Sequence, residues 1–297
     1  MFKYERYSNF SKTRLNYIKF TFINNKKNMG ILYSRSIGAL SARGKYIFSI
    51  DNDDMFLDKD IFSTITNISI EGNFDIVEFR GILSLKGDYI FTNETRDIYL
   101  TNNNLNMVIF QPKLSEYPIK ARIDGDGYRL ISVYLWNKCI KTNIYQLALN
   151  RLGKESYSRF MLSHEDVIAM FILFNTANSY KYVGKYGIFH IKRNKSALSL
   201  TSQKQKYLKE LYFAEVIIDF AKDISEHKKL IIISINRLIN YNILDKIIKI
   251  NITYKNIILK CLNKYLKSRY ISNETKEKIV KKIKIINNTK TVNISIK

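Results

Sequence analysis

The sequence predicts an α/β fold over the first 200 residues, followed by a basic helical tail. Three observations favour this class. Residues 15–50 alternate strand, helix and strand patterns, and residues 163–191 join a strongly apolar helix to a β-rich segment. Residues 203–286 show a series of basic amphipathic helices. We therefore expect a sheet-containing domain over 1–202 and an α-helical basic region over 203–297.

The first part of the chain predicts a βαβ unit. Residues 15–24, LNYIKFTFIN, alternate and are rich in β-forming side chains, which is typical of a strand. Residues 31–42 carry small and apolar side chains at helical spacing, and Gly44 is placed as a helix C-cap. Tyr46–Ile50 predict a second strand. Such a unit has parallel strands and binds ligands at their carboxyl ends.

The later elements continue the alternation. Their patterns predict a helix over 58–69, a strand over 74–83, a polar hairpin or excursion over 84–125, a short strand and then a helix over 130–153 ending at Gly153, a helix over 163–179 with Ser163 as N-cap, and a strand over 180–191.

Composition restricts the class of protein only loosely. The 297 residues are 46% hydrophobic, which is ordinary for a globular protein. Cys139 and Cys261 predict small buried side chains in a reducing compartment rather than a disulfide framework. The start shows no signal-peptide pattern, and no apolar run is long enough to span a membrane, so we expect a cytoplasmic protein.

The net charge of +23 makes the surface attractive to nucleic acid, anionic lipid or anionic substrates. Residues 201–297 contain 21 Lys and Arg against 8 Asp and Glu, and residues 1–200 contain 28 against 18. Because lysine is abundant throughout, the charge by itself indicates no particular partner. The basic helices do suggest peripheral contact with an anionic membrane surface.

Aspartates follow directly after the predicted strand Tyr46–Ile50. A buried carboxylate needs compensation, and a hard divalent cation such as Mg²⁺ or Mn²⁺ supplies it through oxygen ligands. Asp51 and Asp53, separated by one residue, are therefore candidate metal ligands. The alternative is a solvated cluster that caps the helix expected near Asp58.

The stretch NMGILYSRSIGALSARGKYIFSIDNDD resembles the nucleotide-binding half of family 2 glycosyltransferases, whose catalytic domain has the GT-A fold, a Rossmann-type sheet flanked by helices. Ser34 and Ser36 depart from the family pattern. The residues that match are Asn28, Gly30, Arg35, Gly38, Ala42, Gly44, Tyr46, Ile47, Asp51, Asp53 and Asp54.

The resemblance implies roles for three of these residues. Asp51 would contact the donor sugar or ribose and stand as a further metal ligand. Asp53 would ligate the divalent metal that bridges the diphosphate, and Arg35 would hold the nucleotide. The alternative for Arg35 is an arginine on the surface of a helix.

The segment His164–Asp166 opens the strong helix. Inverting transfer needs a general base for the acceptor hydroxyl, and in the family this base lies in an acidic pair at such a helix start. The resemblance assigns it to Asp166, with Glu165 as the other candidate. Acidic residues that simply favour the helix N-terminus are the alternative.

Two further segments carry candidate residues that the resemblance implies. LWNKCIK places Trp136 and Lys138 on the acceptor side, although Trp136 also suits a core position. GIFHIKRNKSALS offers His190 to the metal, and Lys192 and Arg193 to the diphosphate, although charge runs are usually solvated.

The match runs from about Tyr17 to Ser202 and lacks the family's first two βα units. The sequence thus indicates an N-terminally truncated catalytic domain, a degenerate relative, or a chain completed by a partner. The predicted function is transfer of a sugar, with inversion and metal assistance, from a nucleotide-diphosphate sugar to an acceptor hydroxyl. We expect a UDP-sugar donor and a glycan, lipid or protein acceptor.

Two other functions stay open from the sequence. An inactive glycosyltransferase-like remnant would bind no nucleotide-sugar. A basic nucleic-acid-binding protein is disfavoured, because the lysines show no interleaved aromatic pattern and no recognised motif, so no nucleic-acid partner is expected.

Overall fold

The computed structural model describes most of the predicted sheet domain and part of the tail. The described residues are 19–57, 59–84, 96–97, 108–110, 134–158, 160–161, 165–191, 211–216, 218–219, 255–269 and 271–288.

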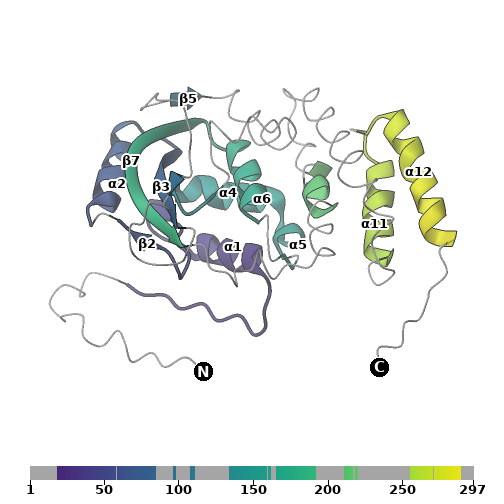
Figure 1. The fold of residues 1–297 in the computed structure, drawn as a ribbon, viewed down its shortest axis with the longest axis horizontal. Helices are drawn as coiled ribbons and strands as arrows, with labels where there is room; N and C mark the ends of the chain where they lie inside the picture. The colour runs from purple at the N-terminus through teal and green to yellow at the C-terminus, as the bar shows by residue number, and fades with distance from the viewer. Residues whose placement is uncertain are drawn as a thin grey trace.

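A mixed sheet lies at the centre of the fold (Figure 1). Its path runs β1-β6-β3-β7-β2, with β4 added to β3 and β5 added to β7. The long strands β3 and β7 are parallel, and the other pairings are antiparallel. In the described part of the chain the strands are β1 (Tyr46–Phe48), β2 (Met55–Phe56), β3 (Ile76–Ser84), β4 (Arg96–Asp97), β5 (Val108–Phe110), β6 (Lys138–Lys141) and β7 (Ser179–Ile191).

Helices cover both faces of this sheet. Alternate residues of a strand point to opposite faces, so Val77 and Phe79 join a small cluster with α2, while Ile76 joins a larger cluster with α4 and α6. The helices around the sheet are α1 (Ile31–Ser41), α2 (Ile61–Glu71), α4 (Thr142–Leu152), α5 (Lys154–Tyr157) and α6 (Glu165–Phe174).

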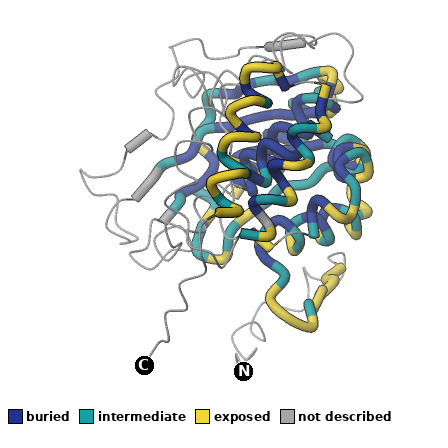
Figure 2. Tube along the Cα trace, turned by 90° about the vertical axis from the view of Figure 1, so that its right-hand side faces the viewer, coloured by how far each residue is buried: buried dark blue, intermediate teal, exposed yellow. Residues whose placement is uncertain are grey.

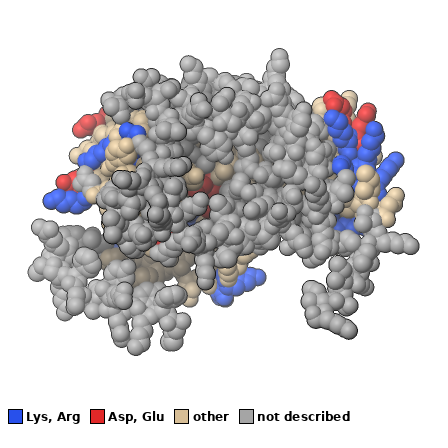
Figure 3. Space-filling model, viewed as in Figure 1, with Lys and Arg blue, Asp and Glu red and all other residues tan. Residues whose placement is uncertain are grey.

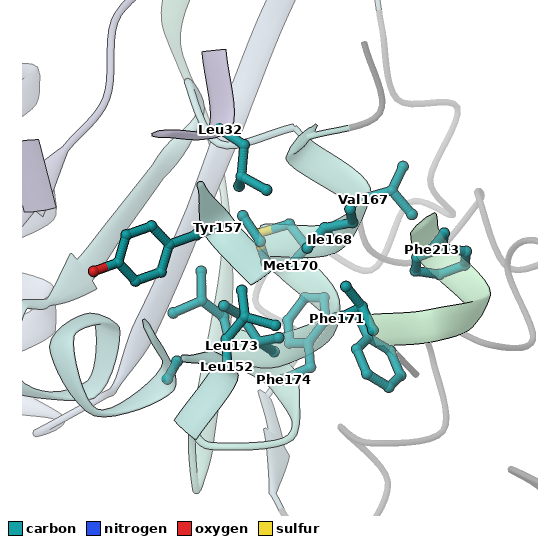
Figure 4. Close-up of a cluster of buried hydrophobic side chains, with 14 of the residues drawn as sticks. Leu32, Leu152, Tyr157, Val167, Ile168, Met170, Phe171, Leu173, Phe174 and Phe213 are labelled. Carbon is teal, nitrogen blue, oxygen red and sulfur yellow. The ribbon is translucent and has the colours of Figure 1, made fainter. Parts of the chain in front are cut away.

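Helix α6 lies in the middle of the larger cluster. Every residue from Val167 to Phe174 is buried, so this helix is apolar all round and must be enclosed on all sides. Leu32 of α1, Leu152 of α4 and Phe213 pack around it (Figure 4). This burial fixes the position of the first turn of α6, which carries Glu165 and Asp166.

The C-terminal helices α11 (Lys255–Leu266) and α12 (Asn273–Asn288) lie beyond α5 (Figure 1). Their buried side chains, among them Leu262, Tyr265 and Ile279, belong to the same hydrophobic cluster as α6. In Figure 2 the outer face of α12, the helix nearest the viewer, is largely exposed. The expected boundary near residue 202 lies outside the described residues. None of the described helices has the length and apolarity that crossing a bilayer requires.

Most predicted elements form, with shifted ends. Helix α2 begins at Ile61 rather than 58, and β3 covers Ile76–Ser84 where 74–83 was expected. Ser163 lies outside the described residues. Of the expected excursion over 84–125, the structure describes only Ser84, β4 and β5.

Two expectations are wrong. Residues 19–24 form no strand: they run exposed at the surface, with Phe20 64% exposed, and 15–18 lie outside the described residues. A β-prone segment becomes a strand only where a neighbouring strand pairs with it. Among the described residues the expected βαβ unit does not form, and β1 pairs antiparallel with β6 instead. Gly44 is not the C-cap, because α1 ends at Ser41 with Ala42 in extended conformation.

Candidate functional site

The loop before α1 anchors the site. Asn28 Oδ1 accepts a hydrogen bond from the Gly30 amide at 3.0 Å, and the Ile31 amide donates to the Met161 carbonyl at 3.0 Å. Gly30 has φ of +87°, and a Cβ there would lie 2.8 Å from Met161 N. A glycine is therefore required for this close approach. The contact brings α1 against the chain that leads into α6.

One turn into α1, Arg35 joins three segments of the chain. Its Nη2 lies 2.5 Å from Asp51 Oδ1, and its Nη1 lies 3.0 Å from Glu165 Oε1 and also pairs with Asp166 Oδ1. The four side chains are 10–34% exposed. The structure thus brings together the aspartate that follows β1 and the acidic pair of α6, as candidate residues of one site.

The carboxylates of this cluster outnumber its cation three to one. Burial, together with the charges of Glu165 and Asp51, raises the pKa of Asp166 to about 7 against the opposing charges of Arg35 and Lys138. Burial also raises the pKa of Glu165. Burial alone lowers the pKa of Arg35, but the three carboxylates more than offset it, so this pKa is raised overall. The site therefore favours an added positive charge or a proton.

The chemistry of these side chains fits a divalent cation only in part. Among the described residues, no three His, Cys, Asp or Glu side chains lie together as a ready metal cage. Mg²⁺ commonly takes one or two carboxylates and completes its shell with substrate phosphates and water. Asp53, two residues after the Arg35-bound Asp51, offers such a carboxylate.

His190 does not stand alone as a metal ligand. Its Nδ1 lies 2.7 Å from Asp54 Oδ1, which ties the end of β7 to the loop after β1. Burial lowers the pKa of His190, but the hydrogen bond to Asp54 and the nearby aspartates more than offset it, so the pKa is raised. A metal contact through Nδ1 would require this pair to separate.

Trp136 is a core residue with stacked neighbours. It is 3% exposed, and its ring stacks on His190 at 5.2 Å between centroids with 8° between the planes. Tyr134, which is 39% exposed, stacks on Trp136 at 5.2 Å. A Cβ on Gly81 would lie 2.4 Å from the Trp136 ring. The exposed aromatic face is therefore that of Tyr134, which the sequence analysis did not single out.

Lys138 is fully buried rather than directed to a surface where an acceptor binds. Its Nζ lies 3.0 Å from Glu78 Oε2 and donates to the Tyr134 carbonyl at 2.6 Å. Asn137 and Tyr180 also donate to the Glu78 carboxylate. Contact between the Lys138 ammonium and an acceptor would have to break this network. Lys192 and Arg193, expected at the diphosphate, lie outside the described residues.

Sequence reasoning missed Glu78 and its network. Glu78 stands in the apolar stretch DIVEFRG, where a charged residue in a core strand already indicates a paired carboxylate. Its partner Tyr180 lies 102 residues away, so the pairing itself was not predictable.

Comparison with known proteins identifies the fold. A scan against protein-family models and a sequence search of curated proteins found no match. Solved structures of S. aureus TarS residues 1–349 are similar to this chain at 12% identity. The complex with UDP-GlcNAc gives a TM-score of 0.55 and covers 89% of this chain and 72% of that one.

Two further TarS structures agree. The complex with UDP gives a TM-score of 0.51 over 89% of this chain and 71% of that one, and TarS 1–349 alone gives 0.50 over 88% and 71%. The likeness shows that this chain has a GT-A-like, glycosyltransferase-like α/β fold.

Proposed function

We propose that the protein is a glycosyltransferase that moves a sugar from a nucleotide-diphosphate sugar to an acceptor hydroxyl with inversion. The observation that carries the proposal is the meeting of Asp51 with Glu165 and Asp166 around Arg35, within a GT-A-like fold. Two of the similar TarS structures hold UDP-GlcNAc and UDP, which supports a UDP-sugar donor. The acceptor class, whether glycan, lipid or protein, stays a prediction.

Asp166 is the proposed general base. It would take the proton of the acceptor hydroxyl while that oxygen bonds to the anomeric carbon and the nucleoside diphosphate leaves on the opposite side. A pKa near 7 suits a base at neutral pH. Glu165, bound to the same guanidinium nitrogen, is the alternative base.

Mg²⁺ or Mn²⁺ is the proposed cofactor, with Asp53 as its protein ligand beside the donor diphosphate. The ion would stabilise the negative charge that develops on the leaving group. Asp51 and His190 remain further candidate ligands; they pair with Arg35 and Asp54 respectively. Lys192 and Arg193 stay predicted donor contacts, whereas Trp136, 3% exposed and stacked on both Tyr134 and His190, is not proposed as an acceptor contact.

Calorimetric titration with UDP and with GDP, in Mn²⁺ and in chelator, tests this proposal. We expect UDP binding that requires Mn²⁺ and is lost in Asp53→Ala. Asp60→Ala is the matched control, because Asp60 is an exposed aspartate at the start of α2. Binding unaffected by chelator would contradict the metal assignment. A folded wild-type chain that binds neither nucleotide would favour the inactive remnant.

We also propose that α12 contacts an anionic membrane surface, where an acceptor would be met. Residues 255–288 contain ten Lys and Arg against two Glu. Lys278, Lys281 and Lys284 are exposed on α12, beside the exposed apolar side chains of Val280 and Ile285. Figure 3 shows Lys and Arg side chains gathered where this helix lies. Basic and apolar side chains on one helix face are typical of interfacial binding.

Sedimentation with lipid vesicles tests the membrane proposal. We expect binding to phosphatidylglycerol vesicles, little binding to phosphatidylcholine vesicles, and weakening as salt rises. Replacing Lys278, Lys281 and Lys284 by Gln should reduce binding several-fold, whereas Lys59→Gln and Lys154→Gln, at exposed sites elsewhere, should not. Equal binding by both variants would contradict a specific role for α12.

A further inference from the structure

We infer that Arg35 is a positioning residue that joins the Asp51 loop to the first turn of α6, rather than a ligand of the nucleotide. The inference rests on the proposed function for its catalytic consequence. Its structural part, the coupling of Arg35 to Asp51 and Asp166, stands without it.

Both terminal nitrogens of Arg35 are engaged by carboxylates. Nη2 donates to Asp51, 16 residues further along the chain, and Nη1 donates to Glu165 and Asp166, about 130 residues further along. A planar guanidinium presents donors in a fixed fork, so it can hold two acceptors in separate directions at once. The compact ammonium of a lysine has no such fork. The side chain thus bridges the loop after β1 and the first turn of α6, both of which carry proposed substrate-facing carboxylates.

The direction of Arg35 is set by its helix. Leu32, Ser36 and Ala39 bury one face of α1, and the Gly30–Met161 contact fixes its start. Arg35 therefore projects beside that buried face, over the first turn of α6. A guanidinium that left the carboxylates for a nucleotide would leave three carboxyl groups facing one another without their shared cation.

The bridge has a specific catalytic consequence. Without Arg35, repulsion between Asp51 and Asp166 would move the loop after β1 away from α6. The loop after β1 carries the proposed donor contacts, and α6 carries the proposed base. A misplacement of about 1 Å between reacting groups costs on the order of 100-fold in rate. Loss of Arg35 should therefore reduce kcat much more than it reduces donor affinity.

The test compares Arg35→Met and Arg35→Lys with wild type in two measurements. UDP affinity is measured by calorimetry in Mn²⁺, and kcat is measured as UDP release from UDP-GlcNAc, with water in place of the acceptor. We expect the UDP Kd to change by less than about threefold and kcat to fall by about 100-fold in both variants. A third variant, Arg35→Ala, leaves room for a free guanidinium ion, and adding that ion to the solution should partly restore its kcat.

Arg151→Met is the matched control. Arg151 is a partly buried arginine of α4 that bonds the Asn175 carbonyl and the Thr176 hydroxyl, so its loss should leave both UDP Kd and kcat near wild type. A UDP Kd raised tenfold or more in Arg35→Met, with kcat unchanged at saturating donor, would make Arg35 a nucleotide ligand and overturn the inference.

A second measurement needs no substrate. Thermal unfolding of Arg35→Met, Asp166→Asn and the double variant tests the bridge directly. If Arg35 holds Asp166, the double variant should lose less in Tm than the sum of the single losses. Additive losses would overturn the bridge. A wild-type chain that releases no UDP, together with coupled losses, would instead overturn the proposed function and leave the bridge intact.

Discussion

Two charged centres lie on this sheet domain, and they are built differently. The Arg35 centre shares one guanidinium among Asp51, Glu165 and Asp166, and its side chains are 10–34% exposed. The Glu78–Lys138 centre pairs one carboxylate with one ammonium, at 1% and 0% exposure. The first centre has an excess of carboxylates, whereas the second is balanced.

The difference follows from the cost of burying charge. A fully buried pair survives only if each charge is matched and the remaining hydrogen-bonding atoms are satisfied, and Asn137 and Tyr180 supply that at Glu78. A partly exposed cluster can keep an unbalanced charge, because water reaches it and its pKa values shift. Partly exposed clusters with perturbed pKa values are candidate functional sites.

The largest effect should come from the unbalanced centre. Asp166→Asn removes the proposed base, so we expect turnover to fall by about 10²–10⁴-fold. Stability should change little, because the lost ion pair with Arg35 is offset by the loss of repulsion between Asp166 and its neighbours Asp51 and Glu165. UDP release from UDP-GlcNAc and thermal unfolding measure the two quantities. Glu155→Gln, at an exposed site in α5, is the control, and normal turnover in Asp166→Asn would reassign the base.

The balanced centre should respond in stability instead. Lys138→Met leaves the Glu78 carboxylate buried without its cation, so we expect a loss of about 3–5 kcal/mol in the free energy of unfolding. The double variant Glu78→Leu with Lys138→Met should recover much of this loss. Urea denaturation provides the measurement. A single-variant loss below about 1 kcal/mol would show that water reaches the Glu78–Lys138 pair.

The pH dependence of kcat should distinguish the unbalanced centre further. Because the pKa of Asp166 is raised to about 7, its carboxyl is protonated below that pH and cannot accept a proton. At saturating donor we expect kcat to fall about tenfold per pH unit on the acid side and to level off above about pH 8. A rate independent of pH between 5 and 8 would contradict Asp166 as the base.

The smallest change in stability should come from breaking a surface ion pair, which resembles neither centre. Lys278 and Glu274 pair at 2.7 Å across one turn of α12, with side chains 49% and 76% exposed. Water screens this pair, so Glu274→Gln should leave Tm unchanged within experimental error. A clear drop in Tm would show that α12 is held by its surface charges as well as by its buried face.

Much of the candidate site was predictable from local sequence. The aspartates after an apolar strand and the acidic pair opening an apolar helix were both singled out, and the structure brings Asp51, Glu165 and Asp166 together around Arg35. The surroundings were less predictable. The Glu78–Lys138 pair and the stack of Trp136 on His190 depend on side chains from segments far apart in the sequence, which no local pattern relates.

The sequence by itself determined which segments form helices and strands in most of the described core, because periodicity of apolar side chains is a local property. It also determined where carboxylates follow a strand or open a helix. Only the tertiary structure decided that 19–24 forms no strand, that β1 joins β6, and that Lys138 is buried against Glu78. Strand pairing and charge pairing depend on which partners the fold brings within contact distance, and that distance is not encoded in any single segment.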